Sequence, residues 1–191
     1  MTAKILVFAG SLREASWNFK IAKVAGAGAA AAGADVTTIA LHDYPMPVFN
    51  EDLEASEGLP ETVVAFRQLM LDADGFIIGT PEYNGAVTAA LKNAIDWASR
   101  PKDGESPLAC FKGKACGLVA ASPGGLGGIR GLPMARTVLS GIGVHVIPTQ
   151  VAVGGVHEKF DASGAMTDDK FRGMLEGLGA EVARVAAALK G

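Results

Sequence analysis

Short apolar runs of strand length alternate with longer segments of helical periodicity, and this alternation constrains the fold more than any other feature of the sequence. The apolar runs cover residues 4–9, 36–41, 76–79, 114–121 and 144–149. The helical segments cover residues 18–33, 60–74, 88–99, 132–141 and 168–190, and residues 42–58 are expected to form a long loop. Strands that alternate with helices build a parallel sheet with right-handed crossovers. The sequence therefore predicts an α/β fold with a doubly wound, five-stranded parallel sheet.

Such a sheet also predicts where a ligand binds. An open doubly wound sheet holds its ligand beyond the carboxyl ends of the strands, at a point where the strand order reverses. Three of the predicted strands are followed by segments rich in Gly, Ser, Pro or Asn, at residues 10–18, 80–85 and 122–131. We expect these three loops to form the binding site.

Length and composition limit the other possibilities. The chain has 191 residues, of which 49% are hydrophobic and 19% are charged, and this predicts one globular domain over residues 1–191. No apolar run approaches the roughly 20 residues that cross a bilayer, and none near the N-terminus suits a signal peptide, so a cytoplasmic location without membrane insertion is expected. The net charge of −3 gives no basic face and argues against nucleic acid as a partner.

The loop at 10–18 is suited to an anion such as phosphate. It lies between a buried strand and the start of a helix, where free N–H groups and the helix dipole favour negative charge. Ser11 and Ser16 add hydroxyl groups, Arg13 adds a guanidinium group and Asn18 adds an amide. The alternative is that Ser16 or Asn18 only caps the helix and that Arg13 is solvated.

The other two loops offer backbone groups close to a ligand. The segment from Pro81 to Gly85 could present N–H and C=O groups to the edge of a flat heterocycle, with Tyr83 beside the ring. The alternative is a turn chosen for its backbone geometry. Ser122, Gly124 and Gly125 belong to a Gly-rich loop that a ligand can approach closely. This loop does not match G-x-G-x-x-G, because Arg130 stands at the last position, and no P-loop is present.

The remaining conspicuous residues indicate structure and no metal site. The three histidines, His42, His145 and His157, lie far apart without metal-ligand spacing, and the two cysteines, Cys110 and Cys116, are expected to be reduced thiols. Trp97 is expected to pack in the interior. The acids Glu51, Asp52 and Glu54 are expected at a solvated loop edge, and Asp168 and Asp169 should start the last helix.

Two motifs together resemble the NADPH-dependent FMN reductase family of the flavodoxin superfamily. They are Gly-Ser-Leu-Arg-x-x-Ser-x-Asn at 10–18 and Pro-Glu-Tyr-Asn at 81–84, the second followed by Leu-Lys-Asn-Ala-Ile-Asp-Trp at 91–97. The Ser-Pro-Gly-Gly segment at 122–125 supports the likeness, which covers most of the chain. The resemblance implies a flavodoxin-like sheet with strand order 2-1-3-4-5.

The resemblance also implies the residues that bind FMN. Ser11, Arg13, Ser16 and Asn18 would hold the phosphate. Pro81, Glu82, Tyr83, Asn84 and Gly85 would line the isoalloxazine ring, and Ser122, Gly124 and Gly125 would close its far side. Glu14 and Phe19 depart from the family, which often has a basic and a polar residue there. Glu14 leaves one cation fewer near the phosphate.

The implied activity is an FMN-containing reductase that uses NADPH or NADH by a ping-pong route. The acceptors would be quinones, flavins, azo compounds or metal oxyanions such as chromate. No catalytic side chain is expected, because the chemistry resides at flavin N5. A homodimer or homotetramer is implied, with the helix around residues 91–97 as a contact. The alternatives are a flavodoxin-type electron carrier and a non-catalytic flavin-binding regulatory protein.

Overall fold

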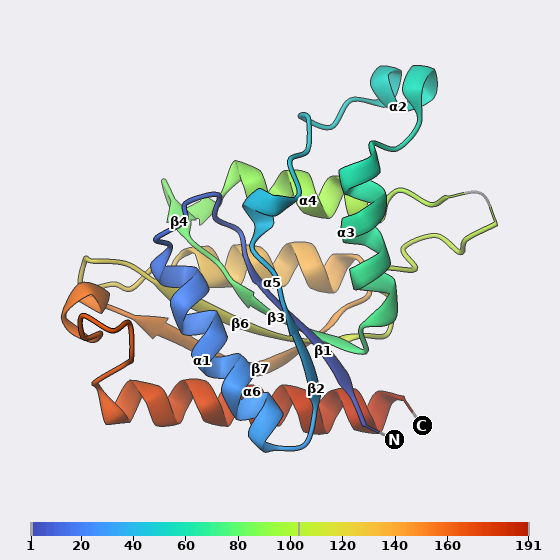
Figure 1. Ribbon diagram of the computed structural model, residues 1–191. Helices are drawn as coiled ribbons and strands as arrows, with labels where there is room; N and C mark the ends of the chain where they lie inside the picture. The colour runs from blue at the N-terminus through green and yellow to red at the C-terminus, as the bar shows by residue number, and fades with distance from the viewer. Residues whose placement is uncertain (1, 103, 191) are drawn as a thin grey trace.

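The computed structural model describes residues 2–102 and 104–190 and has three layers, with a parallel sheet between two sets of helices (Figure 1). The main strands are β1 (Lys4–Ala9), β2 (Asp35–Thr38), β3 (Gly75–Gly79), β6 (Ala115–Ala121) and β7 (His145–Val153). They lie in the order β2-β1-β3-β6-β7, and every pair is parallel. This is the predicted order 2-1-3-4-5, so the predicted flavodoxin-like sheet is confirmed.

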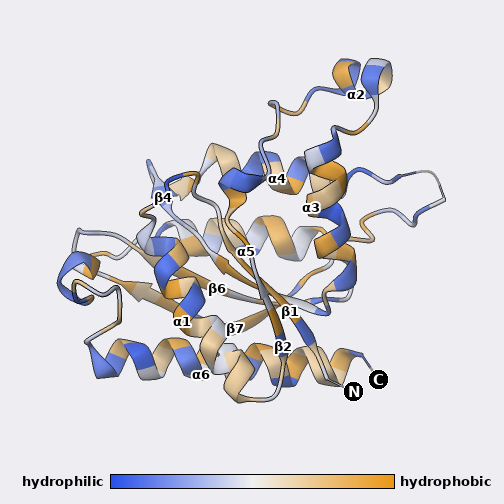
Figure 2. Cartoon of the chain, in the orientation of Figure 1, coloured by the Kyte–Doolittle hydropathy of each residue, from blue (hydrophilic) through white to orange (hydrophobic). Residues whose placement is uncertain are grey.

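Helices cover both faces of the sheet because its central strands are apolar on both sides (Figure 2). On one face lie α1 (Trp17–Ala31) and α6 (Asp169–Leu189), packed on Ile5, Val7 and their neighbours. On the other lie α3 (Glu61–Asp72), α4 (Ala89–Ser99) and α5 (Gly131–Gly141), packed on Leu6, Phe8 and their neighbours. Successive β1 side chains thus enter opposite cores, as the period of two in a strand requires.

The sheet edges differ from the prediction. The run expected at 36–41 forms a strand only to Thr38, and Leu41–Asp43 form a 3₁₀ turn, because this edge strand pairs on one side only and is mostly exposed. The strand expected at 144–149 continues to Val153. Pro148 lies where the register with β6 shifts, and pairing resumes beyond it with buried Val151 and Val153.

The loop expected at 42–58 contains a short helix, α2 (Glu51–Glu57), which the sequence analysis missed. Asn50 caps it by accepting a hydrogen bond from the Asp52 N–H, and none of its residues is buried. The helix stands away from the main body above α4 (Figure 1). Its lack of an apolar face explains why periodicity did not reveal it.

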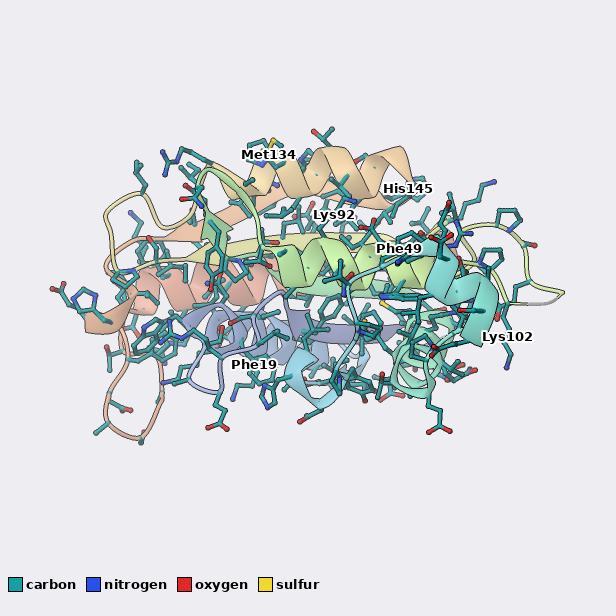
Figure 3. All side chains as sticks on the ribbon, turned by 90° about the horizontal axis from the view of Figure 1, so that it is seen from above. Phe19, Phe49, Lys92, Lys102, Met134 and His145 are labelled. Carbon is teal, nitrogen blue, oxygen red and sulfur yellow. The ribbon has the colours of Figure 1, made fainter. Side chains whose placement is uncertain are left out.

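The segment before α2 is tied to α4. The Trp97 indole N–H and the Asn93 amide both donate to the Pro47 carbonyl. Phe49 lies beside α4 in Figure 3, with its ring centroid 5.0 Å from that of Trp97 in an edge-to-face pair. The expected interior role of Trp97 is therefore confirmed. Glu54, expected at a solvated edge, instead accepts a hydrogen bond from Arg100 Nε at 2.8 Å.

Candidate functional site

The loops that follow β1, β3 and β6 meet at the carboxyl edge of the sheet, where the sequence predicts the site. They enclose a cavity of about 150 Å³. Its lining residues are Ser11, Arg13, Ser16, Trp17, Asn18, Pro81, Glu82, Tyr83, Ala121, Ser122 and Pro123. Trp17, Ala121 and Pro123 were not among the predicted site residues, since nothing but their position beside polar neighbours indicates a site.

A larger cavity of about 960 Å³ lies at the opposite end of the strands, between α1 and α6. Small residues such as Ala32, Gly33 and Gly177 line most of it, and it faces the amino ends of the strands. Doubly wound sheets bind ligands at the carboxyl ends of their strands, so the smaller cavity is the candidate site.

The loop between β1 and α1 carries the features of an anion site. Ser16 caps α1, because its Oγ accepts a hydrogen bond from the Phe19 N–H at 3.3 Å. Ser11 Oγ accepts from the Arg13 N–H. Within residues 2–102 and 104–190, the backbone N–H groups of Glu14, Trp17 and Asn18 have no acceptor. Free N–H groups at a helix N-terminus give a positive end that attracts an anion.

The Asn18 side chain has a different partner from the one expected. Its Nδ2 donates to the Ala121 carbonyl and its Oδ1 accepts from the Ala121 N–H, each at 2.9 Å. The carboxamide therefore joins the start of α1 to the last residue of β6, and only the backbone N–H of Asn18 remains free for a ligand in the loop. The sequence could not reveal this pair, whose members lie 103 positions apart.

Arg13 lines the cavity and is exposed, and its neighbour Glu14 is exposed as well. In the described part of the chain, the Arg13 guanidinium has no hydrogen-bond or ion-pair partner. It is therefore able to reach an anion held by the loop without first breaking an existing contact.

The segment after β3 is a two-residue hairpin. Strands β4 (Glu82–Tyr83) and β5 (Ala86–Val87) pair antiparallel around Asn84 and Gly85. Both turn residues have positive φ, at 54° and 81°, as a type I′ turn requires. Asn84 and Gly85 thus form the tight turn that the sequence predicts, and neither lines the cavity. Tyr83 does, with a side chain that is 54% exposed.

The glycines after β6 divide into two pairs. A Cβ at Gly125 would have no atom within 4 Å, and one at Gly124 would meet only Ser122 Oγ at 3.7 Å. At Gly127, where φ is +62°, a Cβ would lie 2.7 Å from the backbone of Val153 and Gly154. Gly124 and Gly125 therefore leave open space beside the cavity, whereas Gly127 permits close packing of backbone against backbone.

Thr80 lies next to the site without lining the cavity. It follows β3, precedes Pro81 and is fully buried. Its hydroxyl is the one buried side-chain polar atom in the described chain that lacks a partner. A buried hydroxyl without a partner is costly and calls for an explanation. The free N–H groups of the loop before α1 and the open space at Gly124 and Gly125 fit a polar planar ligand with a phosphate, as FMN is.

Glu82 is the acidic residue of the site. Its side chain is 7% exposed, and it pairs with Arg130, which precedes α5. Burial by itself raises the pKa of the Glu82 carboxyl, but hydrogen bonds from the side chain and backbone of Arg130 together hold the pKa below its ordinary value. The carboxylate is therefore ionised at neutral pH.

No group of three or more His, Cys, Asp or Glu side chains among residues 2–102 and 104–190 is arranged to hold a metal ion. No helix in these ranges is both long enough and apolar enough to span a membrane.

Comparisons with known proteins agree with this geometry. Residues 3–158 match the family described as NADPH-dependent FMN reductase. The chain is 37% identical over 175 residues to an NAD(P)H-dependent FMN reductase from Pseudomonas aeruginosa, covering 91% of this chain and 89% of that one. It is 34% identical over 189 residues to a quinone reductase from Escherichia coli, covering 95% and 96%.

A solved structure extends the likeness to three dimensions. It is the flavoenzyme FerB from Paracoccus denitrificans, an NAD(P)H:(acceptor) oxidoreductase. Its TM-score is 0.79 at 28% identity, with 98% of each chain covered. The sequence match, the shared topology and the phosphate-type loop agree with one another. The chain belongs to the NADPH-dependent FMN reductase family.

Proposed function

We propose that the protein is an NAD(P)H-dependent FMN reductase that delivers electrons to quinones and similar small acceptors. One observation carries the proposal. Free N–H groups at the start of α1 border the same cavity as Tyr83 and Ser122, from the two loops that would flank a flavin ring. The P. aeruginosa and E. coli relatives, described as an FMN reductase and a quinone reductase, support the same conclusion.

The residues would divide the work as follows. The N–H groups of residues 14–18 and the guanidinium group of Arg13 would hold the FMN phosphate. The hairpin with Tyr83 would lie along one side of the ring, and the open backbone at Gly124 and Gly125 would accept it on the other. When bound, FMN would supply the redox chemistry between the nicotinamide and the acceptor. The protein binds and orients the reactants.

The size of the cavity indicates how substrates reach the site. At about 150 Å³ it is smaller than the roughly 300 Å³ at which pockets enclose a drug-sized ligand. A flavin held there would remain largely open to solvent from this chain's side. An open planar surface suits acceptors that stack and disfavours selection of one shape. We therefore propose that the nicotinamide and the acceptor use the same opening in turn, and that flavins, azo compounds and chromate are also accepted.

The first test is FMN binding. Titration of the apoprotein should quench flavin fluorescence with a saturable curve, and Arg13→Ala should weaken binding by about 1–3 kcal/mol, since it removes a charge-assisted hydrogen bond to phosphate. Glu14→Ala is the matched control, because it removes an adjacent exposed charge of opposite sign and should not weaken binding. A protein that does not bind FMN would contradict the proposal, and equal affinity for wild type and Arg13→Ala would exclude the role of Arg13.

The second test is steady-state kinetics with NADPH or NADH and a benzoquinone. Parallel double-reciprocal lines are expected if the two substrates share one opening. Intersecting lines would mean that both are bound together. If FMN binds but no acceptor is turned over, the protein is an electron carrier or a flavin-binding regulator, and the proposed activity is wrong.

A further inference from the structure

Glu82 has more polar contacts than a residue that only lines the ring would need. Its Oε2 accepts a hydrogen bond from the Arg130 backbone N–H at 2.9 Å, and its Oε1 accepts from Arg130 Nε at 2.6 Å. Arg130 Nη2 forms an ion pair with the same carboxylate. Arg130 lies 48 positions away along the chain, on another site loop.

These contacts close the N-terminus of α5. Arg130 occupies the N-cap position with helical φ and ψ, and no side chain of the α5 segment itself caps the helix. The N–H of the first helical residue, Gly131, donates to the Gly128 carbonyl, and the Glu82 carboxylate accepts from the N–H of Arg130 just before it. The helix dipole favours negative charge at this end of a helix. A distant residue thus places a carboxylate at the start of α5.

The same contacts hold the hairpin in place. Strands β4 and β5 pair through two residue pairs only and do not join the main sheet, and so short a ribbon is not stable by itself. Its first residue, Glu82, packs against the backbone that precedes α5. A Cβ at Gly131 would be 3.4 Å from Glu82 Cβ, and one at Gly128 would be 3.6 Å from it. Both are ordinary contact distances, so Glu82 lies beside the backbone of these two residues.

We propose that Glu82 is a positioning residue that locks the Tyr83 hairpin to the loop before α5, so that the two walls of the site keep the separation a flat ring needs. This rests on the proposed function. Because its carboxylate is occupied by Arg130, Glu82 acts on the ligand through this partner and not as a direct ligand of the ring. Tyr83, the next residue, is placed by this lock.

A double-mutant cycle tests the proposal with FMN as the probe. Glu82→Ala and Arg130→Ala should each raise the dissociation constant of FMN, Glu82→Ala by at least tenfold. The double variant should be no weaker than Glu82→Ala, because both changes break one lock. Glu82→Gln keeps an acceptor oxygen for the Arg130 N–H and should recover part of the affinity and of the visible circular dichroism of bound FMN. Arg172→Ala, which breaks an ion pair with Asp169 on α6, is the matched control and should bind FMN like the wild type.

The lock can also be measured without flavin. Hydrogen exchange of the apoprotein should become faster in Glu82→Ala at residues 82–87 and 128–133, and remain unchanged in the central strands. If wild type fails to bind FMN but this exchange pattern appears, the proposed function fails and the lock stands. Unchanged exchange, or strictly additive losses of affinity in the cycle, would overturn the positioning role.

Discussion

At the scale of single residues, the environment of the two cysteines decides their chemistry. Cys110 and Cys116 are both buried, and burial raises the pKa of each thiol. The thiolate is the reactive form, so neither side chain should react quickly at pH 8. Titration with a thiol reagent should detect no fast-reacting group in the folded protein and both groups in denaturant. A rapid reaction of the native protein would contradict this assignment.

Asp74 links pH to stability. Burial raises the pKa of its carboxyl, but hydrogen bonds from Lys190 Nζ and the Lys4 N–H, each at 2.8 Å, together lower it below the ordinary value. A depressed folded-state pKa stabilises the protein above the unfolded pKa of about 3.9, and the effect is lost as pH falls through the folded value. Asp74→Asn should therefore cost about 0.2–1 kcal/mol at pH 7 and progressively less below pH ~4.

Denaturant unfolding across pH measures this effect. Asp35→Asn is the control, since Asp35 is an exposed carboxylate without an ion pair among the described residues. If the two variants lose stability equally at every pH, the Asp74 contacts do not contribute.

At the scale of elements, the contact between α1 and α6 depends on glycine. The two helices cross below the sheet (Figure 1), and a Cβ on Gly179 of α6 would overlap the backbone of Ala25 in α1. Gly179→Ala should destabilise the protein by about 1–3 kcal/mol or more, because the helices would have to separate. Gly177→Ala on the same helix meets no atom within 4 Å and should instead stabilise it by up to ~1 kcal/mol through helix propensity.

Thermal unfolding of both variants distinguishes the effect of helix–helix packing from the effect of helix propensity. Similar midpoints for Gly177→Ala and Gly179→Ala would show that the close crossing of the helices is unimportant for stability.

At the scale of the whole molecule, the exposed apolar side chains suggest self-association. Leu12, Leu126 and Ile129 follow strand ends around the site and are each more than half exposed, and Met134 lies on the outer side of α5 (Figure 3). Exposed apolar clusters mark interaction surfaces. Leu91 and Trp97 belong to the segment expected to contact another subunit, but both are fully buried within the chain. A subunit contact at α4 would therefore use the outward side of this helix.

We therefore expect a homodimer or a dimer of dimers that covers the mouth of the site. Light scattering should give a multiple of 19.5 kDa. Leu126→Ser with Ile129→Ser should shift the protein toward the monomer. Leu189→Ser is the control, because Leu189 is an exposed apolar residue at the end of α6, far from these loops. A wild-type monomer at micromolar concentration with full activity would contradict the expectation.

Local patterns were sufficient to predict much of this protein. Apolar runs with the length of buried strands, helical periodicity and the Asn84-Gly85 turn each depend on neighbouring residues, and they predicted the five strands, their helices and the position of the site loops. Residues 10–18 likewise showed an anion-type loop because a strand end, a cap and a helix start lie within nine positions. Helix α2 escaped detection because it buries no residue.

The partners of polar side chains depended on the tertiary structure. Asn18 and Glu82 carry groups suited to a phosphate or a flavin edge, yet the fold brings Ala121 to the first and Arg130 to the second. Gly125 and Gly127 are both glycines of one loop, but Gly125 leaves open space whereas Gly127 permits backbone packing. The sequence by itself determined which segments become strands and helices, because that choice is local. Only the tertiary structure decided which groups remain free for a ligand, because hydrogen bonds form with whichever donor or acceptor the folded chain places within reach.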